Sequence, residues 1–438
     1  MAADQLPPPE QGMGDATAPR PASPASSLSI HSTRSLLSTD LTHVVENGRT
    51  YPNDTYFMPC DGLEQTRLEI LHRLYLAALD GALTTAPLAP GTQRILDVGT
   101  GPGEWASQMA EQFPDAEIVA VDLAVWELPA RDVESDADSD DSSDPKANII
   151  WEIDDLEPYE SSSSNSSNST PHSPVAPSSP SLKAHIAQAA ADMDGLAIDQ
   201  GYASGSTDKT PSEPHSLSEA VDGPSALGEH SDDHDDHDDH AAEVDDGWNF
   251  SEPFDFVHLR DLKGAFRDWR AVYRQAFVNL APGGLIEVVD LMPDFSSATT
   301  PDDDTPSPQP QSALMQLVDA TIAAARAARR PISLDHLDAK ELAAAGFTDV
   351  RRTVVDVPMG PWPDDERRHV MGKMWLVCCA EGLEASCLRL LTRSGGWEVE
   401  RVRGLARRAR EEILEGRHSG IVTQLWFVTA RKARRRGR

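Results

Sequence analysis

The chain has 438 residues, long enough for more than one domain, and a formal net charge of -34. More than half of that excess lies in two short runs, because residues 132–144 hold seven carboxylates and residues 222–246 hold eleven, with no Lys or Arg in either. Such runs repel themselves and bury little apolar surface, so we expect solvated segments there and one mid-sized folded core elsewhere.

The cysteines and the apolar runs indicate the compartment. The four cysteines form no C-x-x-C pair and no spaced framework, which argues against a disulfide-stapled or zinc-binding domain. No run approaches the ~20 apolar residues of a transmembrane helix, and the N-terminus lacks the apolar core of a signal peptide. We therefore expect a soluble, intracellular protein that contacts no membrane.

The beginning of the chain changes character at Glu46. Residues 1–45 are a low-complexity stretch rich in Pro, Ala and Ser, and we predict a disordered arm there. A single folded domain is expected over residues 46–430. It starts with an amphipathic helix over Leu63–Leu83, in which apolar residues recur at helical spacing.

Short apolar runs then alternate with helical patterns, which predicts a doubly wound α/β fold around a mostly parallel sheet. The expected strands are Ile95–Val98, Ile118–Val121, Ile149–Ile153, Phe254–His258 and Leu285–Val289, the last of them following a helix over Trp269–Leu280. Two acidic or Ser-rich stretches, residues 130–146 and 158–247, interrupt this pattern and are predicted to be disordered insertions in loops.

The second half of the domain is predicted to add helices and two more strands. The helices cover Ser312–Ala328, Leu334–Ala345, Asp364–Thr392 and residues 399–414, and the strands cover Thr348–Val357 and Ile421–Ala430. Residues 431–438 follow as a basic tail with six cationic side chains, free at the chain end. Such a tail serves either as a nuclear-import signal or as an internal counter-charge for the acidic runs, so that a nuclear or a cytoplasmic location is expected.

The chemistry is expected at a glycine-rich turn, Asp97-Val98-Gly99-Thr100-Gly101-Pro102-Gly103, between the first predicted strand and a helix. Glycines let the backbone approach a ligand closely, and the amides at a helix start attract an anion. Asp97 suits an ammonium group, so the turn fits the amino-acid end of S-adenosylmethionine (SAM). A dinucleotide fingerprint, G-x-G-x-x-G, would need glycine at position 104, where the chain has Glu104.

Further acids follow the next two strands. Asp122 ends the second strand, where a carboxylate accepts both hydroxyls of a ribose. Asp154 and Asp155 end the third strand, where a carboxylate accepts an adenine amino group, and Asp155 is the preferred residue of the two. One acid in such a position is more often a helix cap or a turn residue, but three in register with one glycine turn favour a SAM site.

His258 and Arg260 close the fourth predicted strand, whose carboxyl end overhangs the transferred methyl group in this layout. His258 suits a general base near neutral pH and Arg260 suits an acceptor carboxylate, although a structural role fits each of them at least as well. Methyl transfer chiefly requires alignment, so no enzyme nucleophile is expected. The four histidines among the aspartates of residues 230–240 are interpreted as part of a solvated tract, and no metal site is predicted.

On these residues the chain resembles the fungal LaeA-type methyltransferases, the TAM-like branch of the class I SAM-dependent methyltransferase family. The likeness rests on Glu46-Asn47-Gly48-Arg49 with Tyr51, on the glycine turn, on Ile153-Asp154-Asp155 and on Phe254-Asp255-Phe256-Val257-His258-Leu259-Arg260. It covers residues 46–157 and 248–430 apart from the insertions. Thr66 departs from the family pattern, because it stands where the family usually has an acid.

The resemblance implies a Rossmann-like class I methyltransferase fold with SAM as its cofactor. The implied cofactor contacts are Asp97, Gly99, Gly101, Gly103, Asp122 and Asp155, with an N-terminal segment around Tyr51 and Arg67 folding over them. The resemblance further implies either a LaeA-like regulator of secondary metabolism or an enzyme of small metabolites, so that the methyl acceptor is a small molecule or a protein.

The sequence also suggests partners and a rival function. A regulatory protein complex is an expected partner, and no direct nucleic-acid contact is expected. The rival from another class is a non-catalytic adaptor that keeps the SAM fold and acts through its disordered segments. The intact glycine turn and Asp122 favour the enzyme. A nicotinamide dehydrogenase is disfavoured by Glu104.

Overall fold

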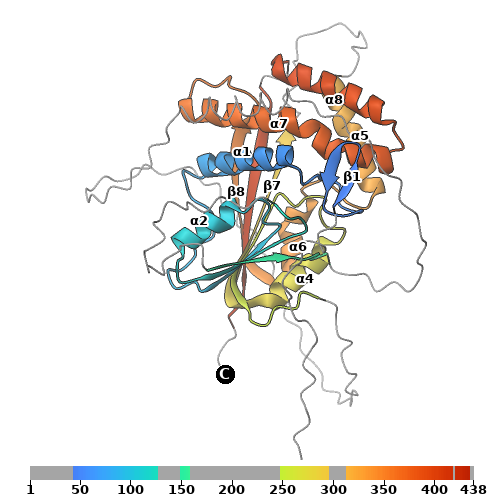
Figure 1. Ribbon diagram of the computed structural model, residues 1–438. Helices are drawn as coiled ribbons and strands as arrows, with labels where there is room; N and C mark the ends of the chain where they lie inside the picture. Colours follow the sequence, from blue (N-terminus) through green and yellow to red (C-terminus); the bar gives the residue numbers. More distant parts are fainter. Residues whose placement is uncertain (1–42, 127–147, 158–246, 295–311, 418–419, 435–438) are drawn as a thin grey trace, which may run out of the picture. The chain divides into compact units, whose positions relative to one another are not determined.

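The computed structural model describes residues 43–126, 148–157, 247–294, 312–417 and 420–434. The two predicted insertions lie outside these ranges apart from Gly247, and so do residues 1–42 of the predicted arm and residues 435–438 of the tail. The described residues form a seven-stranded sheet with helices on both faces and a separate two-stranded hairpin (Figure 1).

The large sheet has the strand order β5-β4-β3-β6-β7-β9-β8. Its strands are β3 (Arg94–Val98), β4 (Glu117–Asp122), β5 (Ile149–Ile153), β6 (Phe254–Arg260), β7 (Leu280–Asp294), β8 (Phe347–Pro358) and β9 (Val422–Lys432). The strands from β3 to β7 are parallel to one another, and β9 is antiparallel to its neighbours β7 and β8. The predicted doubly wound, mostly parallel sheet is confirmed.

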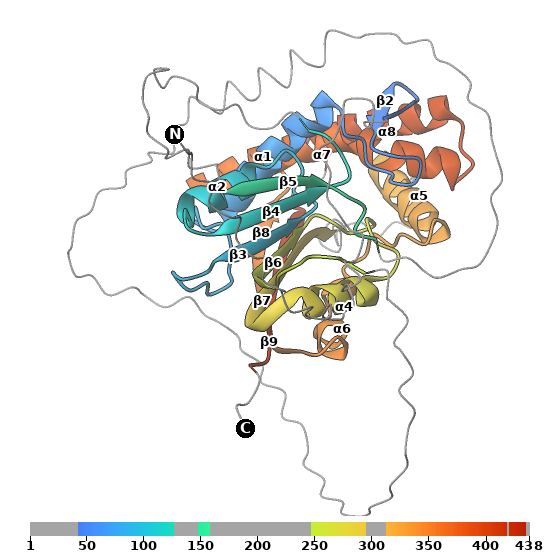
Figure 2. The same ribbon diagram turned by 60° about the horizontal axis from the view of Figure 1, so that its bottom comes forward.

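Helices cover the two faces of this sheet. Those that pack on it are α1 (Gly62–Ala78), α2 (Glu104–Gln112), α4 (Trp269–Asn279), α6 (Ala339–Ala344) and α7 (Glu366–Arg393). Two further helices, α5 (Ala313–Ala327) and α8 (Val399–Leu414), pack against α7. Ile95 packs with residues of α2, whereas Leu96 packs with residues of α4 and α6, because successive strand residues point to opposite faces. α1 and α7 share the face of α2, while α4 and α6 lie on the other side (Figure 2).

The chain order reverses in the middle of the sheet. From β3 the chain moves outward through β4 to β5, and from β6 it moves outward in the opposite direction to β7. β3 and β6 are therefore neighbours from which the two halves diverge. In sheets of this kind ligands bind in the crevice outside the carboxyl ends of the strands at that point.

The described chain begins with a hairpin that the sequence analysis missed. β1 (Val44–Glu46) pairs antiparallel with β2 (Arg49–Tyr51) through a two-residue turn. Asn47 and Gly48 occupy the left-handed region with φ of 52° and 77°, which is the backbone of the Asn-Gly hairpin turn. The predicted disordered arm therefore extended too far at residues 43–45.

Two helices differ from their predicted lengths. α1 ends at Ala78 and not at Leu83, because the Gly81 N–H bonds back to the Leu76 carbonyl at 2.8 Å in a left-handed helix cap. The helix expected over Leu334–Ala345 is divided into a 3-10 turn, Asp335–Leu337, and α6. Asp338 is extended between them, with ψ of 132°, and its side chain caps the start of α6.

Two strands, β7 and β9, are longer than predicted. β7 already begins at Leu280, and β9 continues to Lys432. The prediction of a tail free from residue 431 is therefore wrong for its first two cations. Arg431 donates to the Gly283 carbonyl at 2.6 Å, and the Lys432 ammonium donates to the carbonyls of Phe277 at 2.5 Å and Leu280 at 2.6 Å. Lys432 thereby satisfies carbonyl groups at the end of α4.

Among the described residues, even the longest helix lacks the continuous apolar surface that crossing a membrane requires.

Candidate functional site

A cavity of about 110 Å³ lies outside the carboxyl ends of β3, β4 and β6. Its lining comes from the segment before α1 (Pro52, Tyr56, Met58, Pro59, Cys60), from α1 (Glu64, Arg67, Leu68, Leu71, His72), from the glycine turn (Gly99, Thr100, Gly101, Pro102, Glu104) and from the ends of β4 and β6 (Asp122, Ala124, Trp126, Arg260, Asp261, Leu262). Of the residues predicted for the site, this cavity brings together Gly99, Gly101, Asp122 and Arg260. We refer to it as the switch-point cavity.

The glycine turn joins β3 to α2 in a conformation that favours glycine. Gly101 has φ of 60°, and a Cβ placed on it would meet no atom closer than the Leu68 Cδ1 at 3.8 Å. Gly103 has φ of 90°, and its Cβ would come within 2.4 Å of the Trp151 ring. Gly101 therefore leaves open space beside Leu68, which also lines the cavity, whereas Gly103 is needed for packing against β5 and does not line the cavity.

Asp122 connects the glycine turn to the end of β4. Its Oδ2 accepts the Gly101 N–H at 2.8 Å, and its Oδ1 accepts the Ala124 N–H at 2.8 Å and the Trp126 indole N–H at 3.1 Å. Burial raises the pKa of this carboxyl, while the three donors act in the opposite direction. A carboxylate oxygen has room for a second hydrogen bond, so Asp122 can still accept hydroxyl groups from the cavity.

Asp97 and His258 lie together, but outside this cavity. The Nδ1 of His258 donates to the Asp97 Oδ1 at 2.8 Å, and its Nε2 is 4.0 Å from the Glu287 Oε2. The imidazole is stacked on the Trp105 ring with centroids 3.7 Å apart. All these side chains are buried. The expected projection of His258 toward the reaction is therefore not found, and Asp97 is turned toward the same imidazole instead of into the cavity.

The acids after β5 also lie outside the lining of the cavity. Asp154 and Asp155 are both exposed. Their oxygens accept nearby backbone groups, the Asp155 N–H at 2.8 Å and the Glu157 N–H at 3.0 Å respectively, as in ordinary turns. On this side of the sheet Ala124 and Trp126 line the cavity instead.

The N-terminal segment forms one wall of the cavity, as the resemblance implied, but Tyr51 itself does not line it. Tyr51 is fully buried, and the Arg389 guanidinium lies over its ring at 4.1 Å. Arg389 also donates to the carbonyls of Asn53 at 2.7 Å and Tyr56 at 2.6 Å, which ties the segment to α7. The sequence predicted the helix that carries Arg389 but gave no signal for this role, because the burial of one arginine in a long helix is visible only in the structure.

Most of the α1 residues that line the cavity were not predicted from the sequence. Glu64 is buried and receives both arms of Arg67, with the Nε–Oε2 distance 2.9 Å and the terminal nitrogen 2.6 Å from Oε1. This ion pair holds the pKa of Arg67 above its usual range, despite the opposing effect of burial. Cys60 lines the same cavity, and burial raises the pKa of its thiol to about 12, so that it stays protonated.

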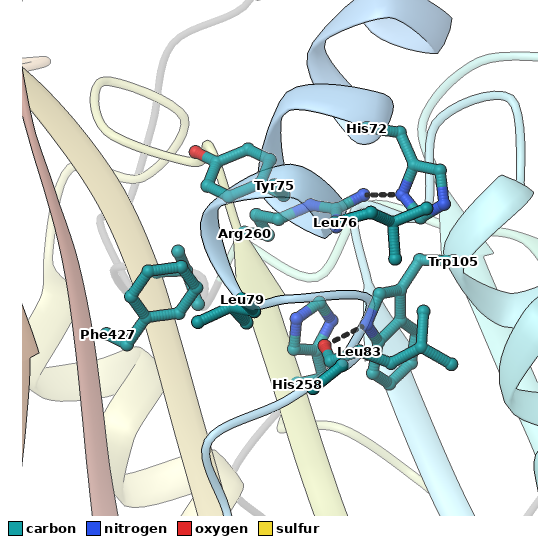
Figure 3. Close-up of a pocket in the computed structure, with 11 residues that line it drawn as sticks. His72, Tyr75, Leu76, Leu79, Leu83, Trp105, His258, Arg260 and Phe427 are labelled. Atoms are coloured by element: carbon teal, nitrogen blue, oxygen red, sulfur yellow. Dashed lines mark hydrogen bonds between the residues drawn. The ribbon is translucent and has the colours of Figure 1, made fainter. Parts of the chain in front are cut away.

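Arg260 extends from the end of β6 between α1 and α2. Its terminal nitrogen lies 3.4 Å from the His72 Nδ1, and its guanidinium lies 4.9 Å from the centre of the Tyr75 ring (Figure 3). Arg260 and His72 also border a second, much smaller cavity of about 10 Å³. His258 and Trp105 lie on its far side, which separates His258 from the switch-point cavity (Figure 3).

His72 is kept neutral by its surroundings. Burial and the neighbouring Arg260 lower its pKa to about 3. Its Nε2 lies 3.1 Å from the Gln108 Oε1, so that Nε2–H donates to Gln108 and Nδ1 accepts from Arg260.

Asp261 is a further cavity residue that sequence reasoning did not single out. It adopts a left-handed backbone with φ of 58°, uncommon for a residue other than glycine, and its N–H bonds to the Val289 carbonyl at 2.9 Å. Tyr75 donates its hydroxyl to the Asp261 Oδ1 at 2.6 Å. Burial, and repulsion from Asp290, raise the pKa of the Asp261 carboxyl.

The switch-point cavity combines the groups that a charged nucleoside requires. Asp122 offers acceptors for sugar hydroxyls, Leu68 and Leu71 offer apolar surface, and Arg260 and Asp261 place opposite charges at one edge. No cluster of side chains suited to a metal ion is found within the described ranges. The doubly wound sheet, the glycine turn after β3 and the acid at the end of β4, with Glu104 in place of the last glycine of a dinucleotide fingerprint, are the features of a class I, Rossmann-like methyltransferase, which uses SAM.

Comparison with known proteins identifies the family. The profile of the family described as "Methyltransferase domain" matches residues 69–350, and the chain belongs to that family. Over 399 residues it is 26% identical to "Secondary metabolism regulator LAE1" of Cochliobolus heterostrophus, covering 89% of this chain and 94% of that protein. It is also 26% identical over 372 residues to "Protein-methionine methyltransferase laeA" of Emericella nidulans, covering 84% of this chain and 71% of that protein. The chain is thus a SAM-dependent methyltransferase of LaeA type.

Among solved structures, the phosphoethanolamine N-methyltransferase 2 of Haemonchus contortus, in complex with SAM, matches with a TM-score of 0.32 and 15% identity. The match covers 87% of this chain and 55% of that chain, so that this protein spans about half the length of that neighbour.

Proposed function

We propose that this methyltransferase is a LaeA-like regulator of secondary metabolism that binds SAM in the switch-point cavity. The observation that carries the cavity assignment is the hydrogen bond from the Gly101 N–H to Asp122, because it joins the glycine turn and the ribose-binding acid in one wall. The regulatory role is supported by the relatives, which include the secondary metabolism regulator LAE1.

Within this proposal the chain's own residues bind and orient the cofactor. Asp122 accepts the ribose hydroxyls, Gly101 leaves room for the cofactor, and the segment from Pro52 to Cys60 covers it and excludes water. SAM supplies a methyl group that is electrophilic because it is attached to a sulfonium sulfur. The principal task of the protein is therefore to align an acceptor with that methyl group.

We propose a methionine thioether as the acceptor. A thioether sulfur carries no proton, so methylation moves the positive charge to the acceptor and requires no general base. The described cavity agrees with such chemistry, because its His72 is neutral and occupied at both ring nitrogens, while His258 is buried outside it. The name of the Emericella relative, a protein-methionine methyltransferase, points to the same acceptor class.

Methyl-labelled SAM tests the acceptor. The purified protein would be incubated with the labelled cofactor and either a protein extract or a small-metabolite extract, and labelled products would be located by mass spectrometry. The proposal expects label on methionine sulfur in proteins, and none with a Gly101→Val control. Label confined to small metabolites, or to lysine or arginine nitrogen, would contradict the proposed acceptor.

We also propose a nuclear location. The support is the basic tail, in which Arg434 to Arg438 follow the two cations that β9 uses. A fluorescent reporter carrying residues 429–438 should accumulate in nuclei, and the same reporter with Arg434, Arg435 and Arg436 changed to Ala should not. An even distribution of the first reporter would end the nuclear proposal for this tail.

A further inference from the structure

The two arginines of the switch-point cavity differ in how their charge is compensated. Arg67 is bonded through both arms of its guanidinium to Glu64. Arg260 instead contacts a neutral imidazole, His72, and the face of Tyr75. In the described part of the chain, Arg260 makes no ion pair with a carboxylate. The nearby carboxylates of Asp261 and Glu104 act on it only electrostatically, so among the described residues its N–H groups have no carboxylate partner and can bind one from a ligand.

The surroundings of Arg260 hold it in place without neutralising it. His72 accepts from the guanidinium through Nδ1 (Figure 3), while its Nε2–H is engaged by Gln108. Tyr75 carries the guanidinium on its ring face, a favourable contact for a cation. A positioned arginine without a carboxylate hydrogen-bond partner presents a planar fork that matches a carboxylate.

Apart from Glu104, the acidic residues that line the cavity can be separated in the same way. Glu64 is occupied by Arg67, and Asp122 accepts three N–H groups around the glycine turn. Asp261 directly follows Arg260, and Tyr75 holds one of its oxygens. Its left-handed backbone allows two consecutive residues at the strand end to line the same cavity.

We propose that Arg260 and Asp261 together bind the zwitterionic amino-acid end of SAM, with Arg260 contacting its carboxylate and Asp261 its ammonium. This inference rests on the proposed cofactor site. It replaces two expectations from the sequence, namely Asp97 for the ammonium and Arg260 for an acceptor carboxylate. Asp97 does not line the cavity and one of its oxygens accepts from His258, and an arginine that binds the cofactor is not available to the acceptor.

Three ligands that differ only at this end test the inference by calorimetry. S-adenosylhomocysteine carries both charges, its decarboxylated analogue S-adenosylthiopropylamine carries only the ammonium, and 5′-methylthioadenosine carries neither. Arg260→Met keeps an unbranched apolar side chain at this position but removes the guanidinium that lies over the Tyr75 ring, and with it the charge. It should weaken S-adenosylhomocysteine by about 10- to 100-fold and leave the other two ligands within about twofold.

Asp261→Asn should give a different pattern. Asparagine tolerates the left-handed backbone and still accepts the Tyr75 hydroxyl, so the fold is preserved. This variant should weaken both ammonium-bearing ligands by about tenfold or more and leave 5′-methylthioadenosine within about twofold. Unchanged binding of 5′-methylthioadenosine also shows that each variant retains a folded nucleoside site.

Two further variants separate the alternatives. Arg267→Met removes an exposed cation outside the cavity and should change none of the three affinities. Glu104→Gln tests the competing acid of the same cavity. If this variant, and not Asp261→Asn, selectively lost affinity for the ammonium-bearing ligands, the assignment of Asp261 would be overturned.

Equal losses of affinity for all three ligands in Arg260→Met, or no loss at all, would overturn the assignment of Arg260. If the wild-type protein bound none of the ligands, the cofactor site itself would be wrong.

Discussion

Gly101 and Gly103 lie two residues apart in the same turn, yet the structure predicts opposite consequences for adding a methyl group to each. A Cβ on Gly101 finds its nearest atom at 3.8 Å, so Gly101→Ala should cost only the left-handed strain, about 1–2 kcal/mol. For a domain of this size that corresponds to a fall in Tm of about 2–8 °C. The added methyl group lies in the cofactor's space, and affinity for S-adenosylhomocysteine should fall by at least tenfold, about 1.4 kcal/mol. The bulkier Gly101→Val should abolish binding.

At Gly103 the added methyl group should affect stability more than cofactor binding. The new Cβ would stand 2.4 Å from the Trp151 ring, and displacing an indole costs about 1–3 kcal/mol beyond the left-handed strain. Gly103→Ala should therefore lose more thermal stability than Gly101→Ala. Calorimetry with S-adenosylhomocysteine and thermal denaturation of both variants measure the two effects. Unchanged affinity in a folded Gly101→Ala protein, or a larger fall in Tm for Gly101→Ala than for Gly103→Ala, would refute the reasoning.

Three further predictions concern the ribose contact, acid stability and the insertion. Asp122→Ala should weaken S-adenosylhomocysteine by about 1.5–3 kcal/mol in calorimetry, the range for charge-assisted hydrogen bonds, and a loss of only a few tenths would place the ribose elsewhere. The folded protein lowers the pKa of His72 to about 3, from about 6.5 in the unfolded chain. Between these two pH values the unfolded chain therefore binds a proton on His72 that the folded protein does not, so the free energy of unfolding falls as the pH drops through that window. His72→Gln should lose less stability than wild type between pH 7 and pH 4 in urea titrations, and parallel losses would contradict a neutral His72. Deleting residues 160–246, a Ser-, Pro- and Asp-rich stretch, should leave affinity for S-adenosylhomocysteine and Tm unchanged, whereas a collapse in Tm would show that the stretch packs on the core.

The architecture was accessible from the sequence because its signals are local. Buried parallel strands appear as short apolar runs such as Ile95–Val98, and a helix between two of them, α4, carries the N-cap Asp268. The glycine turn was recognisable for the same reason. The predicted ends of helices were less accurate where the backbone conformation of one or two residues ends the helix. Asp80 and Gly81 end α1 early through left-handed geometry that hydrophobic spacing does not reveal.

The site was only partly accessible because it depends on register between distant strands. Asp97 is paired directly with His258 across β3 and β6, and strand alternation turns both side chains to the face of Trp105. No local pattern relates two positions separated by 161 residues. Asp261 was missed because its presence in the cavity requires a left-handed backbone, which a single aspartate after a strand does not announce.

The central claim is that SAM binds at the point where the sheet reverses direction, between the glycine turn and Asp122. A crystal structure of the protein with S-adenosylhomocysteine tests it most directly. The account predicts that the ligand lies in the switch-point cavity, with its ribose hydroxyls on Asp122 and its amino-acid end at Arg260 and Asp261. A ligand bound elsewhere on the molecule, or a ribose that does not contact Asp122, would contradict the account.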